Sequence, residues 1–174
     1  MMDLYAHIRD IPDFPKPGIL FKDITPLLKS PEAMMAVEEG FLKAFAGEGI
    51  TAVAGIESRG FIFGIALARR LGVAFLPVRK AGKLPAATIS HSYELEYGED
   101  TIQIHEDAAD KWDRVLIVDD LLATGGTAEA TAALISKLGA EIVGLAFVIE
   151  LSFLNGRARL APHRVESLLT YTGE

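Results

Sequence analysis

The sequence predicts an α/β domain in which helices flank a parallel sheet. Short apolar runs alternate with segments of helical periodicity, the order produced by parallel strands joined through helical crossovers. One run, VLIV at residues 115–118, is too uniformly apolar to leave either face in water, so we expect a strand buried on both sides. With 174 residues, 50% of them hydrophobic, the chain is expected to form a single domain, residues 1–174, around one core.

The amino-terminal segment does not follow this alternation. Residues 4–9 predict a short helix, after which Pro12, Pro15 and Pro17 exclude regular structure. Residues 19–26 mix large apolar side chains with proline, and we expect them to lie against the body of the domain. By default such a segment covers the core, and contact with a ligand is the alternative.

Helices and strands alternate from residue 30 onward. Ser30 followed by Pro31 is typical of a helix start, and glycines after the apolar segments are typical stops. Strand, helix, strand in this order predicts right-handed crossovers. The expected helices span residues 31–46, 61–71, 128–138 and 155–160, and the expected strands span 51–56, 73–78, 115–118, 142–149 and 165–169.

A separate pattern lies between the second and third strands. Residues 88–97 and 101–105 alternate polar and apolar side chains around turn residues, which predicts an antiparallel hairpin projecting from the sheet. A half-polar hairpin beside a ligand-binding edge could act as a lid. An edge hairpin without functional motion is the equally weighted alternative.

Composition excludes several classes of protein. A formal net charge of -7 disfavours bulk attraction to nucleic acid or to an anionic membrane. The absence of cysteine excludes disulfides, thiol nucleophiles and cysteine-bound zinc, and it fits a reducing cytoplasm. The first ten residues resemble neither a signal peptide nor a membrane span, so we expect a soluble cytoplasmic protein.

The candidate ligand site follows the apolar strand. Asp119 and Asp120 are expected at its carboxyl end, the edge of an open α/β sheet where ligands bind. Residues 123–127, ATGGT, can then form a turn of backbone N–H groups that leads into a helix and binds a phosphate. No lysine follows the glycines and no Walker A motif occurs elsewhere, which argues against a nucleotide hydrolase. The acidic pair could bind two ribose hydroxyls or Mg²⁺, or could be an ordinary solvated loop.

Two further features indicate a second phosphate group. The turn at residues 57–60, ESRG, brings another helix N-terminus to the same edge of the sheet. Arg79, Lys80 and Lys83 form a basic cluster at the base of the hairpin, for which a solvated rim is the alternative. Together with the acidic pair, these features favour a ribose 5-phosphate ligand that carries further phosphate.

These motifs resemble the type I phosphoribosyltransferases. VLIVDDLLATGGT is similar to the signature of that family, and PGILFKDITPLL, GIESRGF, VRKAGKLP and SYELEYG resemble its adenine-specific members over about residues 11–162. The resemblance implies a small hood, from about residues 1–30 and the C-terminal segment, and a mobile arm at about residues 81–108. It implies transfer of the 5-phosphoribosyl group from phosphoribosyl pyrophosphate to adenine, with Mg²⁺, giving AMP and pyrophosphate in purine salvage by a homodimer.

The resemblance also implies roles for individual residues. Asp119 and Asp120 match the pair on the ribose hydroxyls, and they would also meet the metal, directly or through water. The residues that match the 5′-phosphate loop are Ala123, Thr124, Gly125, Gly126 and Thr127. Those that match the surroundings of pyrophosphate are Ser58, Arg59, Arg79, Lys80, Lys83 and Tyr97, with a cis peptide between Glu57 and Ser58.

The remaining matches concern the base. Leu20 matches a residue whose backbone reads the edge of adenine, and Phe21 and Leu151 match the pair that sandwiches the ring. Glu96 matches a carboxylate that handles a purine proton, which makes it the catalytic candidate.

Two alternatives remain beside this function. A transferase specific for a 6-oxopurine is the nearer one, because it would use the same phosphoribosyl site. A non-catalytic regulator that senses phosphoribosyl pyrophosphate is disfavoured, since the sequence offers no spare domain and no basic recognition helix.

Overall fold

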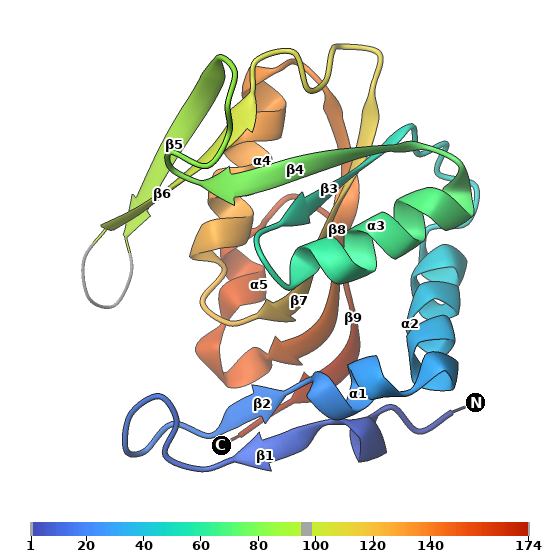
Figure 1. Ribbon diagram of the computed structural model, residues 1–174, viewed down its shortest axis with the longest axis vertical. Helices are drawn as coiled ribbons and strands as arrows, with labels where there is room; N and C mark the ends of the chain where they lie inside the picture. Colours follow the sequence, from blue (N-terminus) through green and yellow to red (C-terminus); the bar gives the residue numbers. More distant parts are fainter. Residues whose placement is uncertain (1, 95–98, 174) are drawn as a thin grey trace.

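A seven-stranded sheet forms the centre of the molecule (Figure 1). The computed structural model describes residues 2–94 and 99–173. The strand order is β5-β6-β4-β3-β7-β8-β9, in which the five strands from β4 to β9 are parallel and the β5-β6 hairpin adds antiparallel to β4. The strands are β3 (Ala52–Ile56), β4 (Ala74–Lys80), β5 (Thr88–Glu94), β6 (Glu99–His105), β7 (Arg114–Leu122), β8 (Glu141–Leu151) and β9 (Val165–Tyr171).

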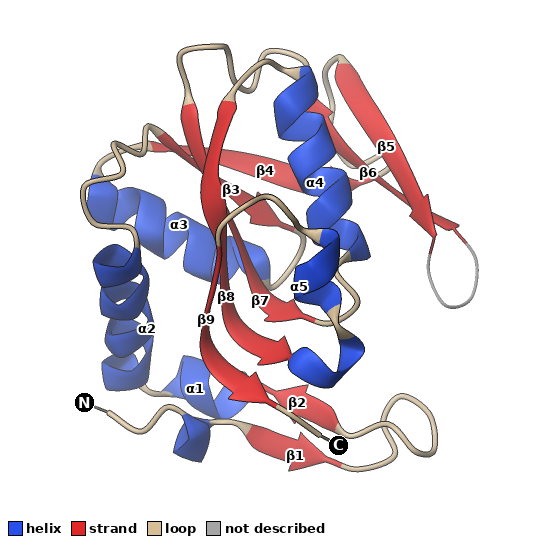
Figure 2. Cartoon of the chain, turned by 180° about the vertical axis from the view of Figure 1, so that it is seen from behind, coloured by secondary structure: helices blue, strands red, loops and turns tan. Residues whose placement is uncertain are grey.

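Helices cover both faces of this sheet (Figure 2). On one face α2 (Pro31–Ala44) and α3 (Gly60–Leu71) pack on Leu116 and Val118, and on the other α4 (Gly126–Lys137) packs on Val115 and Ile117. These four side chains of β7 are all 0% exposed. The prediction of an α/β fold with a central strand buried on both faces is therefore confirmed.

The helix boundaries follow the predicted signals. The Oγ of Ser30 accepts a hydrogen bond from the amide of Ala33 at 3.2 Å, which caps α2 as expected. Gly72 ends α3 in the left-handed conformation, with a φ of 70°. The short α5 (Gly156–Arg159) follows a 3₁₀ turn at Ser152–Leu154, in the region where a short helix was expected.

One predicted strand end is wrong. The apolar run was expected to stop at residue 118, but β7 continues through both aspartates to Leu122. Its partner β8 is long, and Leu122 still pairs with Glu150. The polar residues remain in the strand because the backbone ladder, and not side-chain hydropathy, determines where it ends.

The amino-terminal segment forms a small sheet of its own. Residues 4–9 were expected to be helical, but only Tyr5–His7 forms a 3₁₀ turn, and β1 (Arg9–Ile11) pairs antiparallel with β2 (Phe21–Asp23). A short α1 (Thr25–Lys29) follows. Figure 2 shows β1 and β2 crossing the carboxyl ends of β8 and β9.

Two contacts attach this segment to β9. The Tyr5 hydroxyl donates to the carbonyl of Thr170 at 3.1 Å and accepts from its amide at 3.0 Å. Lys22, only 6% exposed, forms an ion pair with Asp10 at 2.8 Å and lies 4.1 Å from the centre of the Tyr171 ring. The segment is thereby held beside the edge of the sheet where ligands are expected.

The hairpin has the predicted pairing. Tyr93 lies opposite Asp100, and buried Ile102 and Ile104 lie on the face that packs against α4. The described part of the hairpin therefore lies along the edge of the sheet beside α4 and does not project freely (Figure 1). Among residues 2–94 and 99–173, no helix is long and apolar enough to cross a bilayer.

Candidate active site

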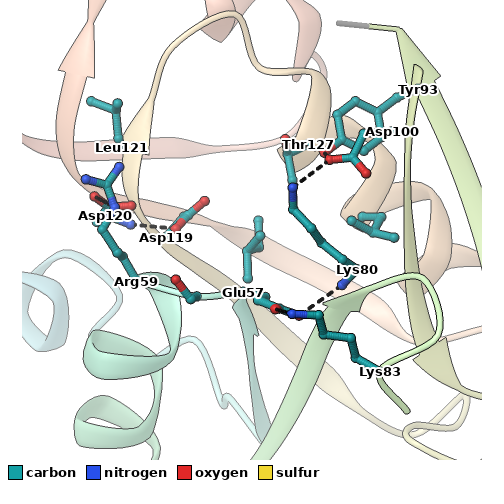
Figure 3. Close-up of a pocket in the computed structure, with 13 residues that line it drawn as sticks. Glu57, Arg59, Lys80, Lys83, Tyr93, Asp100, Asp119, Asp120, Leu121 and Thr127 are labelled. Atoms are coloured by element: carbon teal, nitrogen blue, oxygen red, sulfur yellow. Dashed lines mark hydrogen bonds and ion pairs between the residues drawn. The ribbon is translucent and has the colours of Figure 1, made fainter. Parts of the chain in front are cut away.

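A cavity of about 560 Å³ opens at the carboxyl ends of β3, β4 and β7, with Tyr93, Asp100 and Ile102 of the hairpin as a further wall (Figure 3). This is the edge at which parallel α/β sheets bind ligands. The described residues that line it are Ile56, Glu57, Ser58, Arg59, Lys80, Lys83, Tyr93, Asp100, Ile102, Asp119, Asp120, Leu121 and Thr127.

The acidic pair lies at the floor of this cavity. Burial raises the pKa of Asp119 well above its usual range, and the neighbouring charge of Asp120 raises it further. Burial also raises the pKa of Asp120, an effect that Arg59 opposes through its charge. The Nε of Arg59 lies 2.9 Å from Oδ2 of Asp120. The pair is thus polar, desolvated and costly to keep charged without a ligand, which is typical of a functional site.

The turn after β3 brings Arg59 to the pair. The peptide bond between Glu57 and Ser58 is cis, as the resemblance implies. Gly60 then passes so close to β7 that a Cβ there would lie 2.8 Å from Oδ1 of Asp119. Glycine is required at this position for space, and the close approach places Ser58 and Arg59 at the mouth of the cavity.

The basic cluster is ion-paired within the cavity wall. Lys83 Nζ lies 3.0 Å from Oε1 of Glu57, and Lys80 Nζ lies 3.0 Å from Oδ2 of Asp100. Burial acts to raise the pKa of Glu57, but the hydrogen bonds from Lys83 and from the Lys80 amide outweigh it and leave the pKa lowered. The hydrogen bond to Asp100 raises the pKa of Lys80. Lys80 is therefore protonated at neutral pH.

Arg79 is placed differently from the two lysines. Its Nε lies 3.2 Å from Oε2 of Glu57, and its Nη1 donates to the carbonyl of Lys83 at 3.1 Å. Of the three basic residues expected near pyrophosphate, the structure brings Lys80 and Lys83 into the cavity wall, whereas Arg79 does not line the cavity.

A smaller hollow of about 80 Å³ lies beside the acidic pair. Its wall contains all five residues of the expected 5′-phosphate loop and Asp119, Leu121, Leu122 and Ala128. Gly125 adopts a left-handed φ of 84° and precedes the first residue of α4. The Oγ1 of Thr127 donates to the Tyr93 hydroxyl at 3.0 Å. A loop that ends in a helix N-terminus suits an anion without needing a cationic side chain.

The expected base-binding residues lie outside the larger cavity. Leu20 and Phe21 are half-buried, and Phe21 is the first residue of β2. The guanidinium of Arg59 lies 5.4 Å from the centre of the Phe21 ring, which connects the amino-terminal segment to the cavity. Leu151 is half-buried at the end of β8. The expected catalytic Glu96 and the expected pyrophosphate ligand Tyr97 lie outside the described residues.

Three polar residues of the cavity wall were missed by sequence reasoning. Glu57 was noticed only as part of a turn, although a carboxylate next to a basic cluster is a natural partner for it. Tyr93 and Asp100 face each other in the hairpin, with the tyrosine hydroxyl 3.5 Å from Oδ2 of the aspartate. The period-two pattern could have placed Tyr93 on the inner face, but its pairing with Asp100 depends on the hairpin register.

The donor set suits a magnesium ion shared with a ligand. Asp120 Oδ2 is buried and accepts no hydrogen bond from the described residues, although Arg59 balances its charge. Among residues 2–94 and 99–173, no three His, Cys, Asp or Glu side chains converge into a metal cage. Mg²⁺ commonly binds through one or two carboxylates, water and substrate phosphates, so the residues present fit this ion.

Comparison with known proteins identifies the family. A model of the phosphoribosyl transferase domain matches residues 23–165. The chain therefore belongs to the phosphoribosyl transferase family, as its motifs indicated.

The individual relatives narrow the family further. Adenine phosphoribosyltransferase from Methylococcus capsulatus is 58% identical over 171 residues, which are 98% of this chain and 100% of the relative. The crystal structure of adenine phosphoribosyltransferase from Thermoanaerobacter pseudethanolicus is 52% identical with a TM-score of 0.94, and the match covers 97% of this chain and 98% of that one. The Saccharomyces cerevisiae enzyme, solved with adenine and an imino-altritol bisphosphate, is 42% identical with a TM-score of 0.91, covering 95% and 96%. The resemblance to the adenine-specific members is confirmed.

Proposed function

We propose that this chain transfers the 5-phosphoribosyl group from phosphoribosyl pyrophosphate to adenine, giving AMP and pyrophosphate. One observation carries the proposal: a single edge of the sheet holds an acidic pair between two anion-binding features, the 5′-phosphate loop and the turn with Arg59, Lys80 and Lys83. The adenine-specific names of the relatives, and the adenine in the yeast structure, support adenine as the acceptor. Purine salvage is the role that follows from these substrates and products.

The ligand would lie across the carboxyl ends of the strands. Its 5′-phosphate would occupy the loop from Ala123 to Thr127, where backbone N–H groups and threonine hydroxyls donate. Asp119 and Asp120 would accept hydrogen bonds from the ribose hydroxyls. The pyrophosphate would then meet the remaining anion-binding residues, which are Ser58, Arg59, Lys80, Lys83, Tyr97 and, indirectly, Arg79.

The base would lie on the side of the amino-terminal segment. Phe21 and Leu151 would sandwich the adenine ring, and the backbone of Leu20 would read its edge. The contact between Arg59 and Phe21 supports this arrangement, because it joins the cavity to the segment that we take as the hood. The arm, at about residues 81–108, would close over the ligand and exclude water that could hydrolyse the activated sugar.

The reaction exchanges one bond at ribose C1 for another. The bond from C1 to the pyrophosphate oxygen breaks, the bond from C1 to adenine N9 forms, and positive charge develops on the sugar in between. Arg59, Lys80 and Lys83 would stabilise the negative charge that accumulates on the leaving pyrophosphate. Glu96 would take the proton that adenine loses.

Mg²⁺ is the proposed cofactor. Asp119 and Asp120 would hold it directly or through water, and the buried Oδ2 of Asp120, which accepts no hydrogen bond from the described residues and has Arg59 as its counter-ion, supports that placement. When bound, the ion neutralises part of the charge on the pyrophosphate. We further propose a homodimer by analogy with the family, and a cytoplasmic location, which the absence of cysteine supports.

Parallel assays with four bases test the proposed function. The chain should convert adenine and phosphoribosyl pyrophosphate to AMP, with guanine, hypoxanthine and xanthine as controls. Turnover of a 6-oxopurine without adenine activity would overturn the choice of base, and binding of phosphoribosyl pyrophosphate without any turnover would favour a sensor.

A further inference from the structure

We propose that Gly156 is a positioning residue for the 5′-phosphate loop, and that the ion pair between Glu150 and Arg157 holds it there. The inference rests on the proposed function, because it takes residues 123–127 as the subsite for the 5′-phosphate. Gly156 begins α5, in a part of the chain remote in sequence from that loop.

Gly156 packs backbone against backbone on the loop. A Cβ at Gly156 would lie 2.1 Å from the carbonyl oxygen of Ala123 and 3.0 Å from the amide nitrogen of Gly125. In the reverse direction, a Cβ at Gly125 would lie 2.6 Å from the carbonyl oxygen of Gly156. Real Cβ atoms essentially never come closer than 3.0 Å to such atoms, so any side chain at residue 156 must displace the loop or α5.

Backbone conformation does not explain this glycine. Gly125 has a left-handed φ of 84°, which alone favours glycine, whereas Gly156 is not among the residues with positive φ. Space beside the loop is therefore the reason for glycine at residue 156. The contact fixes one side of a loop whose backbone N–H donors no rotamer change can re-aim.

Contacts of Arg157 with a buried carboxylate and with β9 keep α5 from moving away. The Nε of Arg157 donates to Oε1 of Glu150 at 3.0 Å, and its Nη1 donates to the carbonyl of Val165 at 2.6 Å. Glu150 is only 4% exposed, and the hydrogen bonds from Arg157 lower its pKa, so the pair is charged at neutral pH. The Arg157 side chain is 48% exposed, but its loss would leave the buried Glu150 carboxylate without a partner, which is costly and makes the pair an anchor.

A second contact fixes α5 to the helix that begins in the loop. The Nε and Nη2 of Arg159 donate to Oε2 of Glu129 in α4, at 3.1 Å and 2.6 Å. Gly156 is thus held from both sides of α5, by the ends of β8 and β9 and by α4. A displaced Ala123 or Gly125 would tilt amide donors away from the phosphate.

The test separates the two anionic ends of the ligand. Calorimetry with Mg²⁺ measures the affinity of the full chain for ribose 5-phosphate and, separately, for inorganic pyrophosphate. Gly156→Ala should lower the affinity for ribose 5-phosphate by about tenfold or more, which is the effect of impairing one hydrogen bond to a charged group. Pyrophosphate affinity should stay within about twofold, because its subsite lies on β3 and β4.

Two further variants keep the result decisive. Arg157→Lys retains the charge but loses the forked contact with Glu150. It should therefore lower the affinity for ribose 5-phosphate, by less than Gly156→Ala does, and leave the affinity for pyrophosphate unchanged. Gly72→Ala introduces backbone strain at a φ of 70° where no atom lies within 4 Å, and it should lower the melting temperature without changing either affinity.

Three outcomes would overturn the inference. Unchanged ribose 5-phosphate affinity in both Gly156→Ala and Arg157→Lys would show that the contact does not position the loop. An equal loss of affinity for both ligands would show general damage to the fold. If the unsubstituted chain bound pyrophosphate but not ribose 5-phosphate, the proposed function would fail and this inference with it.

Discussion

Arg59 and Asp120 form an ion pair across the cavity, with Nε of the guanidinium 2.9 Å from Oδ2 of the carboxylate. The Asp120 side chain is 5% exposed and that of Arg59 is 36% exposed, so the aspartate depends on this partner for its charge while the arginine still reaches solvent. The same guanidinium lies 5.4 Å from the centre of the Phe21 ring. One side chain therefore links the ribose, pyrophosphate and base sides of the proposed site.

Arg59→Ala should strongly weaken binding of phosphoribosyl pyrophosphate. The substitution removes a cation from the pyrophosphate side and leaves Asp120 buried without its counter-ion, and losing one partner of such a pair costs about 2–5 kcal/mol. We expect at least about a thirtyfold loss of affinity by calorimetry. Arg70→Ala, in the last turn of the helix that Arg59 precedes, is the matched control, since its contact with Glu38 lies at the surface. Retained affinity in Arg59→Ala would show that Arg59 does not contribute to binding of the pyrophosphate group.

Asp119→Asn should stabilise the ligand-free protein while it weakens binding. Burial, followed by the charge of Asp120, raises the pKa of Asp119 above the ordinary 3.8 of an aspartate. The folded state therefore binds more protons than the unfolded state, and the free energy of unfolding falls as the pH rises from that value through the raised pKa. The amide should remove this loss and raise the melting temperature at neutral pH, by about 2–4 °C for each kcal/mol.

Thermal unfolding across pH and calorimetry with phosphoribosyl pyrophosphate check both halves of this prediction. Asp107→Asn, in the exposed loop after β6, is the control and should change neither quantity. A lower melting temperature for Asp119→Asn at neutral pH would contradict the proposed cost of the charged pair. Undiminished affinity would contradict the ribose assignment.

Much of the central fold could be predicted from the sequence because its signals are local. VLIV at residues 115–118 has no polar face, and the structure buries it between α2, α3 and α4. The Ser30 cap and the glycine stop of α3 likewise depend on neighbouring residues. The two turns that we propose bind phosphate were found for the same reason, since each is one continuous motif.

The remaining features depend on contacts between distant residues. The pairing of residues 9–11 with 21–23 spans a proline-rich loop, and the extension of β7 through Asp119 and Asp120 depends on the length of β8. The ion pairs of Lys80 with Asp100 and of Arg59 with Asp120 join different elements. Neither periodicity nor capping specifies which side chains meet across strands, so these contacts could not be predicted.

The basic cluster should respond unequally to substitution. Lys83→Ala removes a cavity-lining cation and should lower the affinity for pyrophosphate by about tenfold or more, the value of one charge-assisted hydrogen bond. Arg79→Ala should lower it less, because this guanidinium contacts Glu57 and the carbonyl of Lys83 and does not line the cavity. Calorimetry with pyrophosphate compares the two. A larger loss in Arg79→Ala would mean that Arg79 reaches the ligand directly.

Glu96→Ala should lower turnover by about 10²–10⁴-fold, the usual contribution of a general acid or base, while the affinity for phosphoribosyl pyrophosphate stays nearly unchanged. Turnover should fall without a matching loss of affinity because handling a purine proton stabilises the transition state and not the bound sugar phosphate. Glu96→Gln should lose as much turnover, since the amide keeps the size of the side chain but cannot take the proton. Steady-state kinetics and calorimetry measure the two quantities. Glu106→Ala, at an exposed carboxylate after β6, is the control that should match the unsubstituted chain. Unaltered turnover in Glu96→Ala would remove Glu96 from the catalytic step and leave proton transfer to water or to another group of the site.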